Sequence, residues 1–397
     1  MAWSLRRYVL LGAICLLIGW NYWVPAYLYP TAAGLYGSGH PDFNIFYVAG
    51  LLWLSHENPY LKTQFTPFVY PPPSFPFYGM FALFDLSLAS WLWMATYFIV
   101  FALAFLALAL TFQGERRFFY VSIALLLFFT SYPLLLMMVL GQSDLLIAGL
   151  TILSLASQKT KHRFVSALML SVGILMKGSA IFLLIYFVVF RRDWKYLAYF
   201  LACTLAIVGV SLLVVPVQLY WYWIAKVAPT LYSMYELPAS QSIIRPLWLA
   251  GLGKDALQAA SLVGMALFTI FSFYAGPDRS ADASRSNTLR ADAMFLMNGL
   301  IILLLSPRST IYPYVWVILP LALLLSALLM EEVRIAYLAL IGAATFLLNS
   351  TLSQPFLNYA TLPFAMVGNL ILVLSLTVVC LRPSLVIRRV EAAGSTR

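Results

Sequence analysis

The stretch PDFNIFYVAGLLWLSHENPYLKTQFTPFVYPPP, Pro41–Pro73, is the segment around which the rest of the chain is organised. It follows the first strongly apolar run and carries the first two carboxylates of the chain, Asp42 and Glu57. It ends in the Tyr-Pro-Pro-Pro run at residues 70–73, which cannot continue a helix because proline has no backbone N–H. An acid, two histidines, several tyrosines and a proline clamp between two apolar runs predict a binding site.

Composition indicates a membrane protein. The chain has 397 residues, of which 63% are hydrophobic and only 10% are charged. A soluble domain cannot bury that much apolar surface. The net charge is +10, and the basic residues form short clusters between apolar runs. This distribution indicates membrane topology rather than a nucleic-acid-binding surface. The three cysteines lie inside apolar runs and predict neither disulfides nor a metal motif.

The apolar runs predict an all-α, polytopic bundle of about twelve spans, with residues 1–397 as a single transmembrane domain. Three quarters of the 24 Lys and Arg residues then fall on the inner side. The first run lacks a small-x-small cleavage site and is expected to be a retained span. Two long extracytoplasmic loops are expected at residues 25–87 and 216–254, the first with interfacial helices. The expected spans are about 8–24, 88–111, 118–137, 145–157, two half-length helices within 164–190, 196–215, 256–275, 291–305, 312–330, 335–349 and 364–381.

The run at residues 164–190 is unusual because basic clusters flank it on both sides. One helix would place one of these clusters on the outer side. Two half-length helices that meet at Lys177–Ser179 keep both clusters inside, which predicts a turn within the bilayer and a buried Lys177.

Asp42 is the candidate general base. A carboxylate between an apolar run and an interfacial helix is half desolvated, so its pKa can be tuned for proton transfer. The alternative is that Asp42 only caps the helix that begins at Phe43, since Asp is a favoured N-cap residue.

Lys177, Arg245 and Arg308 are the candidate anion-binding residues. A Lys at a break between two short apolar helices needs an anionic partner, and a lipid-linked phosphate suits that depth. The alternatives for Lys177 are snorkelling or pairing within the protein. Guanidinium forks suit phosphate oxygens, so Arg245 and Arg308 could complete a clamp, although Arg308 could instead anchor the outer interface.

The aromatic residues Tyr60 and Tyr70 predict a sugar pocket, where ring faces stack on sugar CH groups; an interfacial aromatic belt is the alternative. His40 and His56 have no third ligand at suitable spacing, so no metal site and no cofactor are expected. No Walker A, G-x-G-x-x-G, G-x-S-x-G or H-E-x-x-H motif occurs, so the sequence does not support nucleotide hydrolysis or soluble-type hydrolase chemistry.

Several short motifs occur in a specific order along the chain. They are Asp42-Phe43-x-x-Phe46-Tyr47-x-Ala49, Asn58-Pro59-Tyr60, Tyr70-Pro71-Pro72, Gly141-Gln142, Lys177 and Ser306-Pro307. In this order the chain resembles glycosyltransferase family 87. These are GT-C-type membrane transferases that include the polyprenyl-phosphate-mannose-dependent alpha-mannosyltransferase of phosphatidylinositol-mannoside synthesis.

The resemblance implies an inverting transfer of a sugar, expected to be mannose, from a polyprenyl-phosphate donor to a lipid or glycan hydroxyl. The reaction is expected on the extracytoplasmic side of a bacterial cell membrane, with membrane lipids but no nucleic acid as partners. The role of base falls on Asp42, and Lys177, Arg245 and Arg308 are expected to bind the donor phosphate. The sugar or acceptor pocket is expected to include His40, Tyr47, Tyr60, Tyr70, Gln142, Asp144 and Tyr312.

The chain departs from the family pattern at two places. Asp144 stands where the family often has Asn, and Thr310-Ile311-Tyr312 replaces a Trp-x-His, so Tyr312 or His40 would have to substitute for that histidine. Two other functions stay open. A transporter or flippase of a lipid-linked or anionic solute would explain buried cations, but would favour paired broken helices in related halves. A non-catalytic scaffold would leave the outer polar residues unexplained.

Overall fold

The computed structural model describes residues 40–62, 68–232, 240–276, 285–306, 309, 312–331, 333–349 and 364–386. Every regular element in these ranges is a helix, as predicted. Among them, four helices are long and apolar enough to cross a membrane, or five if one bent pair counts as a single span. The chain is therefore a helical membrane protein, but this count does not confirm twelve spans. The predicted first span at residues 8–24 lies outside the described residues.

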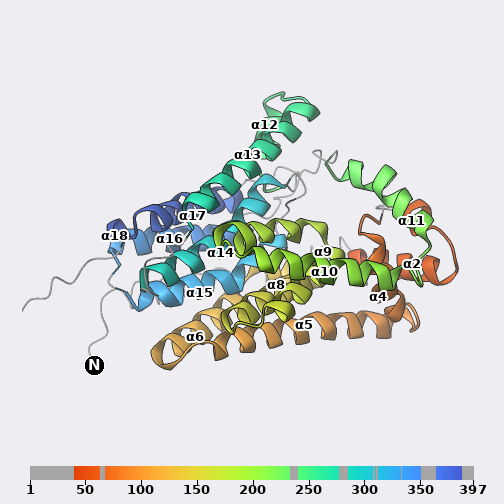
Figure 1. Cartoon of the computed structure of the whole chain (residues 1–397), viewed down its shortest axis with the longest axis horizontal. Coiled ribbons are helices and arrows are strands. Elements are labelled where there is room, and N and C mark those ends of the chain that lie inside the picture. Colours follow the sequence, from red (N-terminus) through yellow and green to blue (C-terminus); the bar gives the residue numbers. More distant parts are fainter. Residues whose placement is uncertain are drawn as a thin grey trace, which may run out of the picture.

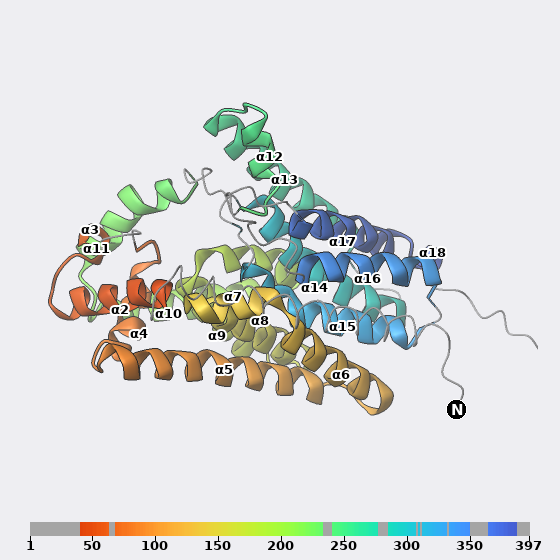
Figure 2. The same cartoon turned by 180° about the vertical axis from the view of Figure 1, so that it is seen from behind.

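The helices pack into one bundle (Figures 1 and 2), which has apolar side chains on its outside and a buried centre. Three peripheral helices, α5 (Leu86–Leu110), α10 (Trp194–Ser211) and α13 (Lys254–Tyr274), expose large apolar side chains along their length. Because water would not stabilise such surfaces, they indicate contact with lipid. The centre is formed by α8 (Asp144–Lys159), α14 (Arg285–Leu305) and α15 (Ile318–Leu329).

Helices α8 and α9 (Arg163–Met176) form an antiparallel hairpin that brings Lys177 back beside Asp144. Helix α8 has 16 residues, about 24 Å at roughly 1.5 Å per residue. After the turn at residues 160–162, α9 returns over 14 residues. The residue after α9 therefore lies at the same end of the bundle as the residue that begins α8.

The predicted break within residues 164–190 occurs at Lys177. This residue is extended (φ −150°, ψ 105°), and it is followed by the 3-10 helix η2 (Gly178–Leu183) and the π-helix η3 (Ile185–Phe190). Arg163, at the start of α9, forms a 2.9 Å ion pair with Asp193, just after η3. The two ends of this segment therefore meet, as the fold-back prediction requires.

Arg116 and Lys159, from two of the predicted inner basic groups, meet at the end of α8 opposite Asp144. Asp292, in α14, is 1% exposed and accepts hydrogen bonds from Arg116 Nη2 at 2.5 Å and Lys159 Nζ at 2.9 Å. This cluster connects the starts of α6 (Gly114–Thr130) and α14 to the end of α8. The Asp292 cluster and Asp144 are thus separated by about the length of α8.

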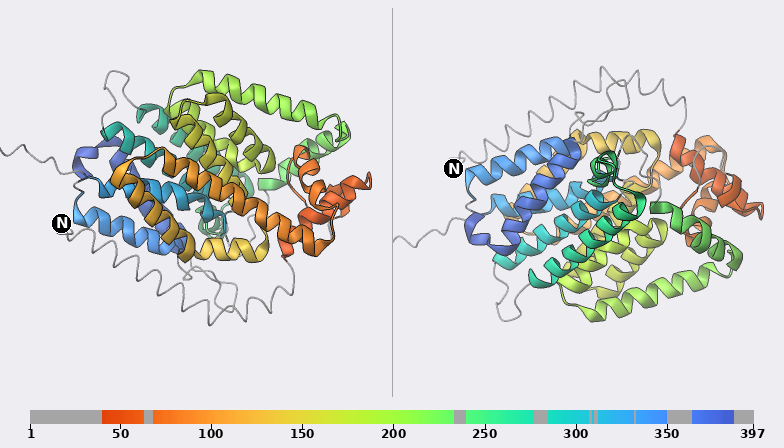
Figure 3. Two further views of the ribbon diagram at one scale, coloured as in Figure 1. Left: turned by 90° about the horizontal axis from the view of Figure 1, so that it is seen from below. Right: turned by 90° about the horizontal axis from the view of Figure 1, so that it is seen from above.

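Short helices cover the Asp144 end of the bundle (Figure 3). Two of them, α2 (Pro41–Leu54) and α4 (Phe75–Phe81), match the short helices predicted in the first loop. The others are α3 (Pro59–Lys62), η1 (Pro72–Ser74), α11 (Val217–Tyr222), η4 (Trp223–Val227) and η5 (Ala228–Tyr232). The 6-residue α12 (Ile244–Leu249) precedes α13.

Two predicted spans differ from the structure. Residues 118–137 are not one straight helix, because α6 (Gly114–Thr130) and α7 (Tyr132–Leu140) meet at a bend of 55°. Ser131 lies in the extended region and its Oγ caps α7, and a proline in the first turn of α7 disfavours continuation of α6. The span predicted at residues 312–330 begins as a 3-10 helix, η6 (Tyr312–Val317). Three further helices complete the described chain: α16 (Ile335–Asn349), α17 (Phe364–Leu381) and α18 (Pro383–Val386).

Candidate functional site

The turn between α7 and α8 positions the start of α2. Gly141 ends α7 with φ +71°, and its carbonyl accepts a 2.8 Å hydrogen bond from the buried indole of Trp93. A Cβ at Gly141 would lie 2.8 Å from both the His40 Cβ and the Phe43 Cβ. His40 Nδ1 also donates to the Val139 carbonyl at 3.2 Å. Only glycine lets α2 approach this turn so closely.

Replacing Gly141 by Ala is expected to destabilise the protein and displace α2. Left-handed backbone at a non-glycine residue costs about 1–3 kcal/mol, and the contacts with His40 and Phe43 add to this. Thermal unfolding in detergent measures the loss. Gly114→Ala is a matched control, because Gly114 also has a positive φ (+55°), but a methyl group there would meet no atom within 4 Å. Equal losses in the two variants would contradict the importance of this contact.

Asp42 lies in the first turn of α2, and its carboxylate is held by Gln142, in the turn between α7 and α8. The N-cap of α2 is His40, so Asp42 does not cap this helix as the alternative supposed. Instead, one oxygen of the Asp42 carboxylate accepts a short hydrogen bond from Gln142 Nε2. Among the described residues, no hydrogen bond is formed by its other oxygen. One oxygen is thus oriented and the other is available to a ligand.

Burial raises the pKa of Asp42 above its ordinary value of 3.8. The hydrogen bond from Gln142 and the charge of Lys177 act in the opposite direction, and the charge of Asp144 adds to the rise. Desolvation dominates, so this carboxyl group binds a proton more readily than an exposed Asp. The electrostatic influence of Lys177 and Asp144 also shows that the three charges belong to one neighbourhood.

Asp144 and Lys177 form a buried ion pair at the Asp42 end of the bundle. Lys177 Nζ lies 2.8 Å from both oxygens of the Asp144 carboxylate. The Asp144 side chain is fully buried, whereas that of Lys177 is 22% exposed. The Lys177 ammonium also lies 6.0 Å from the centre of the Trp316 ring. Lys177 is therefore paired within the protein, as one of the alternatives predicted. A ligand phosphate would bind to this ion pair and not to an isolated cation.

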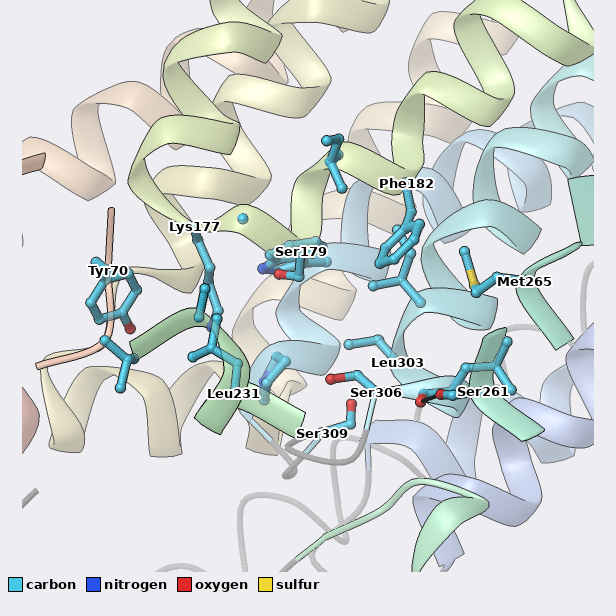
Figure 4. A pocket seen from close by; sticks show the side chains of 18 of the residues that line it. Tyr70, Lys177, Ser179, Phe182, Leu231, Ser261, Met265, Leu303, Ser306 and Ser309 are labelled. Carbon is cyan, nitrogen blue, oxygen red and sulfur yellow. Dashed lines mark hydrogen bonds between the residues drawn. The ribbon is translucent and has the colours of Figure 1, made fainter. Parts of the chain in front are cut away.

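A cavity of about 430 Å³ adjoins this ion pair. Figure 4 shows Tyr70 and Lys177 on one side of the cavity and Phe182 and Met265 on the other. Its polar lining consists of Tyr70, Asp144, Lys177, Ser179, Trp223, Ser261, Ser306, Ser309 and Trp316, and its apolar lining includes Ile181, Phe182, Leu231, Leu262, Met265, Ile302, Leu303 and Leu305. A space of this size with one charged end and one apolar end suits an amphipathic ligand.

The structure gathers some of the predicted site residues and separates others. Asp144, Lys177 and Tyr70 line the cavity, and Asp42 reaches the same cluster through Gln142 without lining the cavity itself. These four come from α8, the break after α9, the chain before η1, and α2. Among the described residues, no three His, Cys, Asp or Glu side chains lie close enough together to hold a metal ion.

Three residues predicted for the sugar pocket or the donor phosphate form hydrogen bonds within the protein. Tyr60 is buried, donates to the Tyr70 carbonyl at 2.9 Å and stacks on Tyr222, so it fixes the backbone of a cavity residue. Tyr47 donates to the Phe84 carbonyl at 2.8 Å. Arg245, in α12, donates to the Ser240 carbonyl at 3.5 Å and does not line the cavity. None of these three residues lines the cavity.

The side chains of two predicted site residues, Arg308 and Tyr312, lie outside the described part of the structure. Arg308 lies outside the described residues, between the cavity-lining Ser306 and Ser309 in the sequence. Tyr312 begins η6, but its side chain lies outside the described part. Sequence reasoning also missed Trp316, because a tryptophan within an apolar run gives no signal that separates a site residue from an interfacial one.

A family model, described as glycosyltransferase family 87, matches residues 68–307 of the chain. The matched region includes Tyr70, Gln142, Asp144 and Lys177, and it ends one residue after Ser306. It covers more than half of the chain. No curated protein compared with the chain matches it.

Proposed function

Because the chain belongs to glycosyltransferase family 87, we propose that it transfers a mannose from a polyprenyl-phosphate donor to a lipid or glycan hydroxyl. The proposed transfer inverts the anomeric centre and takes place on the extracytoplasmic side of the cell membrane. Membership of this family supports glycosyltransferase activity in general. The observation that carries the finer proposal is the cavity that joins the Asp144–Lys177 pair to an apolar wall.

The apolar side of the cavity supports a lipid-linked donor. Ile181, in η2, and Leu262, in α13, both line the cavity, yet they are 44% and 63% exposed. Helix α13 is one of the helices that can cross a membrane. A polyprenyl chain would pass between η2 and α13 into the surrounding lipid, while its phosphate stays at Lys177.

The leaving group in this reaction is the polyprenyl phosphate. Lys177 offers a cation where negative charge develops, and its buried partner holds it in place. The cavity has this cation on one side and apolar residues on the other, an arrangement that suits a ligand whose phosphate joins a sugar to a lipid. Arg308, which lies between two cavity-lining serines in the sequence, is proposed as a further cation for the phosphate.

Asp42 is proposed as the base that accepts the proton of the acceptor hydroxyl. As the acceptor oxygen bonds to the anomeric carbon, the bond from that carbon to the phosphate oxygen breaks, and its electron pair leaves with the lipid phosphate. Gln142 orients one carboxylate oxygen and leaves the other for the acceptor O–H. His40 supports Asp42 through the α7–α8 turn, and Tyr70 lies beside the cavity as a sugar contact.

A transfer assay with the purified full-length chain in lipid nanodiscs tests this function. We expect radiolabel from polyprenyl-phosphate-[14C]mannose to appear in a new glycolipid or glycan when a membrane lipid extract supplies the acceptor. No label should move from GDP-mannose. Transfer from GDP-mannose alone would contradict the lipid-linked donor, and movement of the intact donor across the bilayer without transfer would favour the flippase.

A further inference from the structure

The cavity contains two buried hydrogen-bonding groups that the protein itself leaves unused. Trp316 and Ser309 are 5% and 2% exposed, and both line the cavity. Neither the indole Nε1 of Trp316 nor the hydroxyl Oγ of Ser309 forms a hydrogen bond within the described chain. A buried polar group without a partner destabilises the folded state, so such groups at a cavity wall indicate that a ligand supplies the partner.

A rigid polar layer fixes Ser309 from behind. The Gln241 N–H donates to the Ser309 carbonyl at 2.5 Å, and the Tyr314 hydroxyl donates to the Gln241 carbonyl at 3.2 Å. The Ser309 N–H donates to the Ser306 carbonyl at 3.1 Å. Figure 4 shows the Ser306 and Ser309 side chains next to each other at the cavity wall. The backbone is thus fully engaged, while the Ser309 hydroxyl stays available.

Gln241 adds a third unused group in the same layer. Its side chain is 0% exposed, and neither its amide nitrogen nor its amide oxygen has a partner in the described chain. An amide that both donates and accepts is well suited to hydroxyl groups, which do the same. Trp316 and Ser309 thus offer open hydrogen-bonding capacity to the cavity itself, whereas Gln241 does not line it and lies directly behind Ser309.

We propose that Trp316 and Ser309, backed by Gln241, form a subsite that recognises the hydroxyl groups of the donor sugar and so determines which sugar is transferred. This inference rests on the proposed function. The chemistry distinguishes the sugar from the other parts of the donor. A lipid chain would leave the Trp316 and Ser309 groups unpaired, and the phosphate is drawn to the cation at Lys177. The centre of the Trp316 ring lies 6.0 Å from that cation, so this residue stands close to where a group attached to the phosphate would lie.

The test compares two tryptophans of the same cavity. Trp316→Phe removes the unused N–H and keeps most of the ring. Trp223→Phe is the matched control, because Trp223 also lines the cavity but already donates its N–H to the Val69 carbonyl at 3.0 Å. Ser309→Ala is a second variant that removes only a hydroxyl.

Two measurements on the full-length protein separate the sugar from the lipid. The first is the rise in unfolding temperature caused by polyprenyl phosphate and by polyprenyl-phosphate-mannose. In the wild type, the mannosylated lipid should give the larger rise, and Trp316→Phe and Ser309→Ala should reduce this difference while Trp223→Phe keeps it. The second is kcat/KM for mannose transfer, which Trp316→Phe should lower by about 10-fold to 100-fold. Donors that lack one hydroxyl should be discriminated against less by Trp316→Phe than by the wild type.

Each outcome decides between the two proposals. Equal stabilisation of the wild type by the two lipids, or the same loss of discrimination in Trp223→Phe as in Trp316→Phe, would overturn the sugar subsite. A sugar-dependent rise in unfolding temperature without any transfer would contradict the transfer reaction and support the subsite. Transfer with unchanged kcat/KM and discrimination in Trp316→Phe would overturn the subsite and leave the reaction standing.

Discussion

Asp42→Asn is expected to lower kcat for sugar transfer by about 10²-fold to 10⁴-fold, the usual contribution of a general base. Asparagine has nearly the same shape and can still accept the hydrogen bond from Gln142 Nε2, but it cannot take a proton from the acceptor hydroxyl. The KM for the lipid donor should therefore change little. Radiolabel transfer in nanodiscs at saturating donor measures the effect.

The same variant should fold at least as well as the wild type at neutral pH. Burial raises the pKa of Asp42, so the folded protein binds this proton more tightly than the unfolded chain does. The stability from this group is present below its unfolded pKa and is lost as the pH rises through the folded pKa. Asparagine removes the buried charge, so the unfolding temperature at pH 7 should be equal or higher. A fall in stability that accounts for the lost activity would contradict this assignment.

The pH profile of the wild type gives an independent readout. A base works only when ionised, so kcat/KM should fall as the pH falls through the raised pKa of Asp42. This acid limb should lie above the ordinary pKa of 3.8. Asp85→Asn is the control, since Asp85 caps α5 by accepting from the Leu88 N–H at 3.1 Å and asparagine caps equally well. Full activity in Asp42→Asn, or an equal loss in Asp85→Asn, would exclude Asp42 as the base.

Much of the fold follows from the apolar runs and the charges that delimit them. Helices α16 and α17 have the bounds predicted from hydropathy, because charged or proline-containing segments stand at both sides of each run. The break at Lys177 was predictable from the basic clusters on both sides of it. The bend at Ser131 was not predicted, although Pro133 carried a signal for it, because the hydropathy of α6 and α7 is continuous.

The site was only partly predictable for a different reason. Asp42, Gln142 and Lys177 were picked out as chemical groups, but hydropathy does not tell which anion faces a buried cation. The antiparallel return of α9 along α8 makes Asp144 that anion. Side-chain direction was equally hidden for Tyr60, whose hydroxyl binds the backbone of Tyr70 rather than a ligand.

Lys177→Met is expected to destabilise the protein strongly and to abolish most of the transfer. Removing one partner of a buried ion pair costs about 3–5 kcal/mol, because the Asp144 carboxylate is then left buried without a cation. Losing a cation at the leaving phosphate should lower kcat by a further 10²-fold to 10³-fold or so. Thermal unfolding and transfer rate per folded molecule measure the two effects separately.

The double variant Asp144→Leu with Lys177→Met separates the structural role from the catalytic role. Replacing a buried ion pair by apolar residues is often neutral for stability, so most of the lost stability should return. Transfer should stay low, because no cation faces the phosphate. Asp144→Asn alone should keep transfer within about 10-fold of the wild type, since Lys177 remains and an amide replaces its anionic partner.

Lys159→Met is the matched control for Lys177→Met. Lys159 has the same side-chain exposure of 22% and also pairs with a buried aspartate, Asp292, but it lies at the other end of α8. It should therefore lower stability without lowering the transfer rate per folded molecule. If the double variant regained transfer together with stability, Lys177 would act only as the partner of Asp144, and the phosphate would have to be held by other residues of the cavity. If transfer stayed low in both Lys177 variants but not in Lys159→Met, the loss would belong to the cation at the cavity and not to the missing ion pair.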